Sequence, residues 1–203
     1  MDRFTVYLVD DDAGVRKAVS RLLRARGYDV QSYSSPQEFL QQQDPAAAGC
    51  AVLDVAMPGL DGLALQRALT AGGSRRPVIF ITGKGDVPTS VRAMKAGALD
   101  FLTKPVREKD LLEAIQRAQT RDAELRQLRS ELDSIQAKIN TLTPREREVF
   151  THVVAGRLNK QIAGDLGTVE KTIKVHRSRM MEKLGLRSVA DLVRMAEKAQ
   201  ISK

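Results

Sequence analysis

Acidic side chains stand directly after two short apolar runs in the first part of the chain. Asp10 and Asp11 follow residues 5–9, and Asp54 follows residues 50–53. Consecutive apolar residues are typical of strands buried on both faces, and a sheet's polar rim lies where such strands end. Carboxylates brought together at a rim repel one another, and a divalent cation that prefers oxygen ligands offsets the repulsion. The sequence therefore predicts a Mg²⁺ site that contains these three carboxylates.

The elements that must position these acids alternate along residues 1–105. Apolar runs predict strands near residues 5–9, 29–33, 50–54, 77–82 and 100–102, with helical patterns between them. This alternation predicts an α/β domain with a parallel sheet, because parallel strands need helical crossovers. Ligands of such sheets bind at the carboxyl ends of the strands, where Thr82 joins the three acids.

Lys104-Pro105 completes an ordered set of motifs: paired acids, a central aspartate, a threonine and Lys-Pro. With this set, residues 1–120 resemble the receiver domain of a bacterial two-component response regulator. The resemblance implies a flavodoxin-like (βα)5 fold and phosphorylation of Asp54 by a sensor histidine kinase. It further implies that Lys104 and Thr82 contact the phosphoryl group, and that the Lys104-Pro105 peptide is cis.

The same resemblance assigns the metal and a conformational switch. The Mg²⁺ ligands that it implies are Asp10, Asp11, Asp54 and the carbonyl of Ala56. Thr82 and Phe101 are the implied switch pair, with Phe101 turning inward together with Thr82. Positive charge from the metal and from Lys104 is most of what phosphoryl transfer requires of a protein.

A long helix connects this domain to the rest of the chain. Residues 107–140 contain neither proline nor glycine, so residues 121–140 are expected to form a helical linker that continues the last receiver helix. Apolar spacing alternates between 3 and 4 from Leu125 onward, but Asp122 and the step from Leu125 to Leu128 interrupt the phase. The sequence leaves open whether this helix pairs with a second copy as a coiled coil.

Residues 141–203 form a basic, helical segment. They carry 13 basic and 7 acidic side chains, a large part of the chain's net charge of +8, which predicts a polyanionic partner and nucleic acid first. Thr143-Pro144-Arg145-Glu146 has the pattern of a capping box with proline at the first helical position. Further helical patterns cover residues 159–166, 169–184 and 188–199, so the segment is expected to be all-α.

This segment, through LTPREREVF and NKQIAGDLGTVEKTIKVHRSRMMEKLGLRS, resembles the four-helix, helix-turn-helix output domain of LuxR and FixJ type. The resemblance implies that residues 170–183 form a recognition helix that enters the major groove of promoter DNA. The implied base contacts are Lys174, Val175 and Ser178. The implied phosphate contacts are Lys160, Lys171, Arg177 and Arg179. Thr168-Val169 departs from the usual Ser cap: either Thr168 caps from one residue earlier or the helix start is weakly satisfied.

Together the two resemblances imply a transcriptional regulator switched by phosphorylation of Asp54 that acts as a homodimer, with RNA polymerase as a further candidate partner. It would not be an enzyme beyond slow self-dephosphorylation. One alternative is a Mg²⁺-dependent phosphatase with Asp54 as nucleophile. It fits less well, because common phosphatases of this kind carry the nucleophile and a second aspartate two residues later on the first strand. The other alternative is a constitutive DNA-binding protein whose acids merely bind metal.

Several other residues have simpler interpretations. Asp12, Asp61 and Asp86 are expected to be helix caps or turn residues, and Gly83-Lys84-Gly85 lacks the spacing of a phosphate-binding loop. His152 and His176 are isolated, so no zinc site is predicted, and Cys50 is expected to be a buried, inert thiol. The sequence shows neither a signal peptide nor an apolar stretch long enough to span a membrane, which predicts a cytoplasmic protein without a membrane partner.

Overall fold

The computed structural model describes residues 3–83 and 87–199. It divides the chain into two compact units, Met1–Arg126 and Gln127–Lys203. The division falls inside the range 121–140 that was expected to be a linker. Residues 84–86 lie outside the described ranges, and so do the Lys84-Gly85 part of the glycine loop and the turn expected at Asp86.

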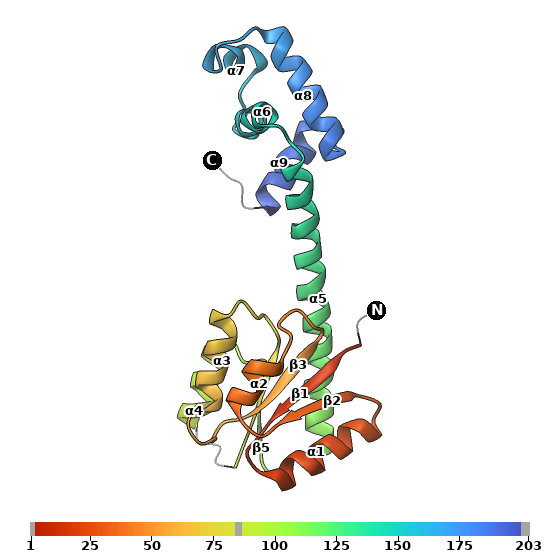
Figure 1. Ribbon diagram of the computed structural model, residues 1–203, viewed down its shortest axis with the longest axis vertical. Helices are drawn as coiled ribbons and strands as arrows, with labels where there is room; N and C mark the ends of the chain where they lie inside the picture. Colours follow the sequence, from red (N-terminus) through yellow and green to blue (C-terminus); the bar gives the residue numbers. More distant parts are fainter. Residues whose placement is uncertain (1–2, 84–86, 200–203) are drawn as a thin grey trace. The chain divides into compact units, whose positions relative to one another are not determined.

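A parallel sheet forms the centre of the first unit (Figure 1). Within the described residues its strands are β1 (Thr5–Val9), β2 (Asp29–Tyr33), β3 (Gly49–Asp54), β4 (Val78–Thr82) and β5 (Asp100–Thr103). Their order is β2-β1-β3-β4-β5, and every neighbouring pair is parallel. This order is that of the flavodoxin-like fold, whose ligands bind where the strand order reverses. The predicted strands and fold class are confirmed.

Helices cover both faces of this sheet because its central strands, β1, β3 and β4, are apolar on both sides. Along β1, Tyr7 and Val9 enter one core, which contains residues of α2 (Pro36–Gln42), α3 (Gly62–Ala71) and α4 (Val87–Lys95). Val6 and Leu8 enter the other core, with residues of α1 (Ala13–Ala25) and α5 (Glu108–Asn140). Because successive side chains of a strand point to opposite faces of the sheet, β1 contributes residues to both cores.

Polar contacts attach helix α5 to the sheet beyond Ala118, the last apolar residue that it buries against the sheet. Ala118 is buried in the core, and one turn later Asp122 is also buried. The Asp122 carboxylate accepts a hydrogen bond from the backbone N–H of Gly49 at 3.3 Å, and Arg126 Nη1 donates to the carbonyl of Ala46 at 2.7 Å. The break in apolar phase at Asp122 therefore marks the point where the helix meets the polar start of β3.

The second unit is built from helices. The last turns of α5 lead into α6 (Pro144–Val154), α7 (Asn159–Asp165), α8 (Glu170–Leu184) and α9 (Val189–Lys198), which share a core with Ile139 and Leu142. The predicted capping box is present: Thr143 Oγ1 accepts from the N–H of Glu146, whose carboxylate accepts from the N–H of Thr143. The all-α expectation for this segment is confirmed. None of the helices in the described ranges is both long and apolar enough to cross a membrane.

Candidate functional site

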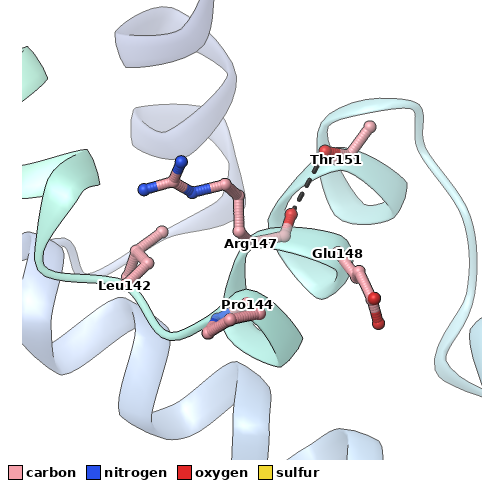
Figure 2. A pocket seen from close by; sticks show the side chains of 5 residues that line it. All are labelled: Leu142, Pro144, Arg147, Glu148 and Thr151. Carbon is pink, nitrogen blue, oxygen red and sulfur yellow. Dashed lines mark hydrogen bonds between the residues drawn. The ribbon is translucent and has the colours of Figure 1, made fainter.

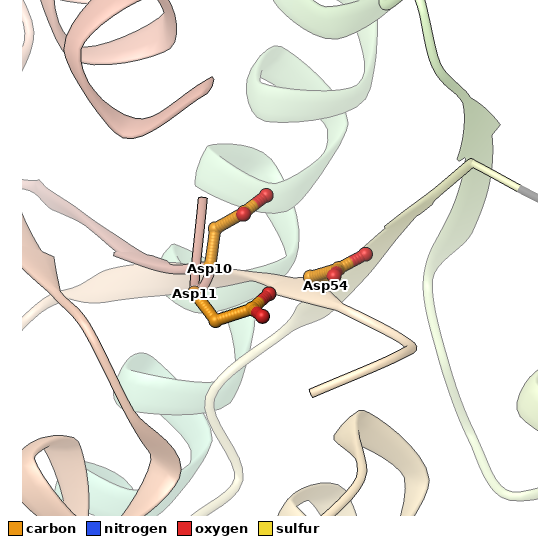
Figure 3. A group of neighbouring side chains, drawn as sticks. All are labelled: Asp10, Asp11 and Asp54. Carbon is orange, nitrogen blue, oxygen red and sulfur yellow. The ribbon is translucent and has the colours of Figure 1, made fainter. Parts of the chain in front are cut away.

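Three carboxylates meet at the carboxyl ends of β1 and β3, as the sequence predicted. Ligand oxygens of Asp10, Asp11 and Asp54 all lie within 4.8 Å of one another (Figure 3). Strands β1 and β3 are neighbours in the sheet, which brings residues about 40 positions apart to the same edge. Among the described residues, this is the only group of three or more acids, histidines or cysteines with metal-binding spacing.

Lys104 supplies the counter-charge of this cluster. Its ammonium lies 2.7 Å from Asp10 Oδ2 and 3.3 Å from Asp54 Oδ1. The peptide between Lys104 and Pro105 is cis, as expected, and the Lys104 N–H donates to the carbonyl of Thr82 at 2.7 Å. Lys104 therefore enters the site directly from the end of β5, next to β4.

The acids differ in their surroundings. Asp10 is 0% exposed, and its Oδ1 accepts from the N–H of Asp12 at 2.9 Å, whereas Asp11 is exposed. Burial raises the pKa of Asp54, Lys104 opposes that shift, and the charge of Asp10 adds to it. Burial lowers the pKa of Lys104, but the contacts with Asp10 and Asp54 outweigh it, so the net shift is upward.

The cluster fits a hard divalent cation. Apart from the Lys104 ammonium, Asp10 Oδ2 and Asp54 Oδ1 have no hydrogen-bond partner among the described residues, although both atoms are buried. Buried anionic oxygens of this kind require more positive charge than one ammonium supplies. Oxygen-only ligands suit Mg²⁺. Ala56 lies in the exposed loop after β3, next to this edge of the sheet.

Thr82 and Phe101 lie on adjacent strands beside the acids. Thr82 ends β4 and is 1% exposed, and Phe101 is half-buried on β5. The register pairs Phe80 with Phe101 and Thr82 with Thr103, so alternation places Thr82 and Phe101 on the same face of the sheet. The rings of Phe80 and Phe101 have centroids 6.4 Å apart. The structure thus brings the expected switch pair onto one face.

The neighbouring aspartates have the structural roles expected of them. Asp12 caps α1 by accepting from the N–H groups of Gly14 and Val15, and Asp61 caps α3 by accepting from Ala64. No sequence pattern indicated a role for Arg16, whose Nη1 donates to the carbonyl of Asp10 at 2.6 Å. No sequence spacing predicts a hydrogen bond from a side chain to a carbonyl six residues away, so only the folded structure reveals this contact.

The second unit presents a basic surface on α7 and α8. Exposed along it are Lys160, Lys171, Lys174, Val175, Ser178 and Arg179. Arg177 is half-buried, and its Nη1 donates to Asn159 Oδ1 at 2.8 Å, which links α8 to α7. Lys174 lies 3.1 Å from Glu170 on the same helix. The predicted DNA-contact residues therefore lie on α7 and α8, two helices that the contact of Arg177 with Asn159 joins.

Helix α8 begins without a side-chain cap. Val169 is the N-cap residue and provides no side-chain hydrogen bond, so of the two expected arrangements the weakly satisfied start is the one observed. At the other end of α8, Lys183 Nζ lies 2.7 Å from Glu146 Oε2. This contact joins α8 to the start of α6, and no sequence pattern indicated it.

The two units match different protein families. Residues 6–116 match the family described as response regulator receiver domain, which includes every residue of the acidic cluster. Residues 140–196 match the family described as bacterial regulatory proteins, luxR family, which includes α6, α7 and α8.

Similarity to known proteins extends over nearly the whole chain. Nodulation protein W of Bradyrhizobium diazoefficiens is 43% identical over 197 residues, covering 97% of this chain and 87% of that protein. Transcriptional regulatory protein FixJ of the same species is 40% identical over 195 residues, covering 96% and 95%. Among solved structures, that of the response regulator StyR is 46% identical with a TM-score of 0.83, covering 97% of this chain and 99% of that chain.

Proposed function

Because the chain belongs to the response regulators that join a receiver domain to a luxR-family output domain, we propose that phosphorylation of Asp54 controls its binding to promoter DNA. The observation that carries this proposal is the position of the Asp54 carboxylate beside two further acids and the Lys104 ammonium. We assign residues 1–120 to the receiver, 121–140 to a helical linker and 141–203 to the DNA-binding domain.

Asp54 is the proposed nucleophile. A carboxylate oxygen attacks the phosphorus of a phosphorylated sensor histidine kinase, an aspartyl phosphate forms, and the phosphorus–nitrogen bond to the kinase histidine breaks. Lys104 neutralises charge on the transferred group, and the Thr82 hydroxyl hydrogen-bonds to it. Mg²⁺, held by Asp10, Asp11, Asp54 and the carbonyl of Ala56, supplies further positive charge when bound. Slow hydrolysis of the aspartyl phosphate ends the signal.

The output step depends on the shared face of β4 and β5. Once phosphorylated, Asp54 draws the Thr82 hydroxyl toward the phosphoryl group, which leaves space for Phe101 to turn inward. This rearrangement changes the outer surface of β5 and favours a homodimer. Two output domains then bind two half-sites of a promoter, and RNA polymerase is a further partner there.

In the DNA complex, side chains near the start of α8 contact base edges. The proposed base contacts are Lys174, Val175 and Ser178. The phosphate contacts are Lys160, Lys171, Arg177 and Arg179, which set position without reading sequence. The link from Arg177 to Asn159 supports a phosphate contact made jointly by α7 and α8.

A phosphorylation assay tests this proposal. The full chain is incubated with a small phosphodonor and Mg²⁺, and label is followed by intact mass and by turnover of the donor. We expect one phosphoryl group per chain, absent in Asp54→Asn and retained in Asp133→Asn, whose carboxylate is exposed on α5. Multiple turnover without stable label would instead indicate a phosphatase. Absence of label in the presence of Mg²⁺ would indicate a constitutive DNA-binding protein.

A further inference from the structure

A basic groove lies beside α1 and the edge strand β2, separate from the acidic cluster. It has a volume of about 470 Å³ and is lined by Ala13, Arg16, Lys17, Ser20, Arg21, Arg24 and Ser32. Helix α1 has no acidic residue between Ala13 and Ala25. Four cationic side chains therefore face one hollow whose lining contains no carboxylate.

Two of the four cations are fixed by main-chain contacts. Arg16 Nη1 donates to the carbonyl of Asp10 at 2.6 Å, and Arg24 Nη2 donates to the carbonyl of Val30 at 3.0 Å. Each guanidinium has five N–H donors, so both keep donors for a ligand after these bonds. In the described part of the chain, neither Lys17 nor Arg21 forms an ion pair. The groove thus combines two oriented guanidinium groups with two uncommitted positive charges.

A buried hydroxyl provides an independent indication of a ligand. Ser20 is 5% exposed, lines the groove and has no hydrogen-bond partner for its Oγ among the described residues. A buried hydroxyl without a partner is unfavourable, and serines inside helices usually bond back to a carbonyl one turn earlier. Ser32 lies two residues after Val30 on β2, which places it on the face of the sheet that α1 covers. Two hydroxyls are therefore available beside the four cations.

We propose that this groove binds a small oligophosphate or phosphate ester. Such a ligand carries several negative charges, accepts paired hydrogen bonds from guanidinium groups and accepts hydroxyl donors at its remaining oxygens. A second hollow, on α6, has a different lining: Figure 2 shows Arg147 and Glu148 extending to opposite sides of it, and Leu142 and Pro144 complete it with Thr151. Its charges are mixed, so an anion has no net attraction there. Of these two hollows, the α1 groove is the one that combines uniform charge with a buried unpaired hydroxyl.

Calorimetric titration of the full chain with inorganic pyrophosphate tests this site. The titration is made in EDTA, so that divalent metal does not recruit pyrophosphate to the acidic cluster. We expect Arg21→Gln to weaken binding about tenfold, the equivalent of losing one charge-assisted contact. Ser20→Ala should weaken it several-fold without lowering the thermal unfolding temperature, because the hydroxyl has no partner among the described residues. A structural serine would instead lower the unfolding temperature and leave affinity unchanged.

Two control variants locate the binding. Arg129→Gln removes an exposed cation of α5, and Lys171→Gln removes one from the predicted DNA surface. Neither should alter pyrophosphate affinity, and amide NMR shifts on titration should cluster in residues 13–32. The proposal is overturned if pyrophosphate fails to bind at millimolar concentration, if Arg21→Gln binds as the wild type does, or if Lys171→Gln accounts for the loss.

Discussion

Asp10 shows how the site depends on charges that balance one another. Its carboxylate is fully buried, and a buried charge is costly unless it is paired. The Asp12 N–H holds one oxygen and the Lys104 ammonium faces the other, while Asp54 adds a second negative charge 3.3 Å from the same ammonium. One cation thus serves two carboxylates. The Asp10 and Asp54 carboxylates therefore repel each other, and a bound divalent cation would offset that repulsion. Cation binding is thus expected to stabilise the site.

Mg²⁺ should therefore stabilise the first unit. At a concentration ten times its Kd, a ligand that binds only the folded state adds about 1.4 kcal/mol to the free energy of unfolding. We expect EDTA to lower the thermal unfolding temperature and Mg²⁺ to restore it. In Asp11→Asn this response should largely disappear, while Asp133→Asn should respond as the wild type does. An equal Mg²⁺ response in Asp11→Asn would contradict the assignment of Asp11 as a ligand.

Removal of the shared counter-charge should destabilise the fold. Lys104→Gln leaves Asp10 without its ammonium, and we expect the free energy of unfolding to fall by about 1–3 kcal/mol without metal. Mg²⁺ should recover part of this loss, since it supplies positive charge to the same oxygens. Urea unfolding with and without Mg²⁺ measures both effects. The control is Lys109→Gln, whose exposed ammonium lies 3.9 Å from Glu113 and should contribute little.

Helix α5 illustrates how one polar residue can specify where an element packs. Asp122 occupies the position one turn after buried Ala118 and accepts from Gly49, so a strand start rather than an apolar core lies opposite it. Burial is the main cause of the raised pKa of Asp122, and the Gly49 hydrogen bond and nearby Arg126 and Arg76 oppose it. Hydrogen bonds therefore attach the helix to the start of β3 just after Ala118, the last apolar residue that it buries against the sheet.

Substitutions at Asp122 should distinguish the contribution of its hydrogen-bond acceptor to the free energy of unfolding from that of its negative charge. Asp122→Ala leaves a buried N–H unpaired and should cost about 1–3 kcal/mol of unfolding free energy. Asp122→Asn keeps an acceptor and removes a charge whose folded-state pKa is raised, so it should be at least as stable at pH 7. The wild type should gain stability relative to Asp122→Asn as pH falls through that raised pKa toward the ordinary value of 3.8. Urea unfolding at several pH values measures this, with exposed Asp133→Ala as control.

The start of α6 should make the second unit sensitive to acid. The Lys183 contact is the main reason that the pKa of Glu146 is lowered, with the Thr143 N–H second. The stability that comes from this lowered pKa is fully present above the ordinary pKa of 4.5. It is lost as pH falls through the lower pKa of the folded state. In Glu146→Gln, the stability of the second unit should depend less on pH in the acid range. Hydrogen exchange of α6 peptides at several pH values measures this. An unchanged acid profile would contradict the role of Glu146.

The start of α8 can be improved, because Val169 offers no cap. Val169→Ser should supply an acceptor for the N–H groups of the first turn and add about 1 kcal/mol to the stability of the second unit. Hydrogen exchange of peptides from residues 168–175 measures the change. Val189→Ser, on the exposed start of already capped α9, is the matched control and should add nothing comparable. Equal effects of the two variants would show that capping is not the cause.

At the scale of the whole molecule, charge is distributed unequally between the two units. Residues 141–203, which include α7 and α8, carry 13 basic and 7 acidic side chains. Residues 1–120 are nearly balanced, with 16 basic and 14 acidic side chains. Attraction to DNA therefore acts on one unit, and phosphorylation acts on the other.

DNA affinity should fall steeply with salt, because phosphate contacts release counterions. In a plot of log K against log salt concentration, Lys171→Gln should reduce the slope by about 1. Lys198→Gln should leave it unchanged, since that ammonium lies 3.2 Å from Glu131. Fluorescence anisotropy of the full chain with labelled DNA measures the slopes. Affinity that is insensitive to salt would refute the charge argument.

The sequence by itself determined the strand and helix pattern, the gathering of Asp10, Asp11, Asp54, Thr82 and Lys104, and the capping box at Thr143. These features depend on local periodicity, on caps, and on the rule that parallel strands end at a common edge, except that the place of Lys104 was implied by the resemblance to receiver domains. Only the tertiary structure revealed the contacts of Asp122 with Gly49, of Lys183 with Glu146 and of Arg16 with Asp10, and the groove beside Ser20. Such contacts join side chains to main chain or to charges at sequence separations that no periodicity specifies, so they exist only once the elements have packed.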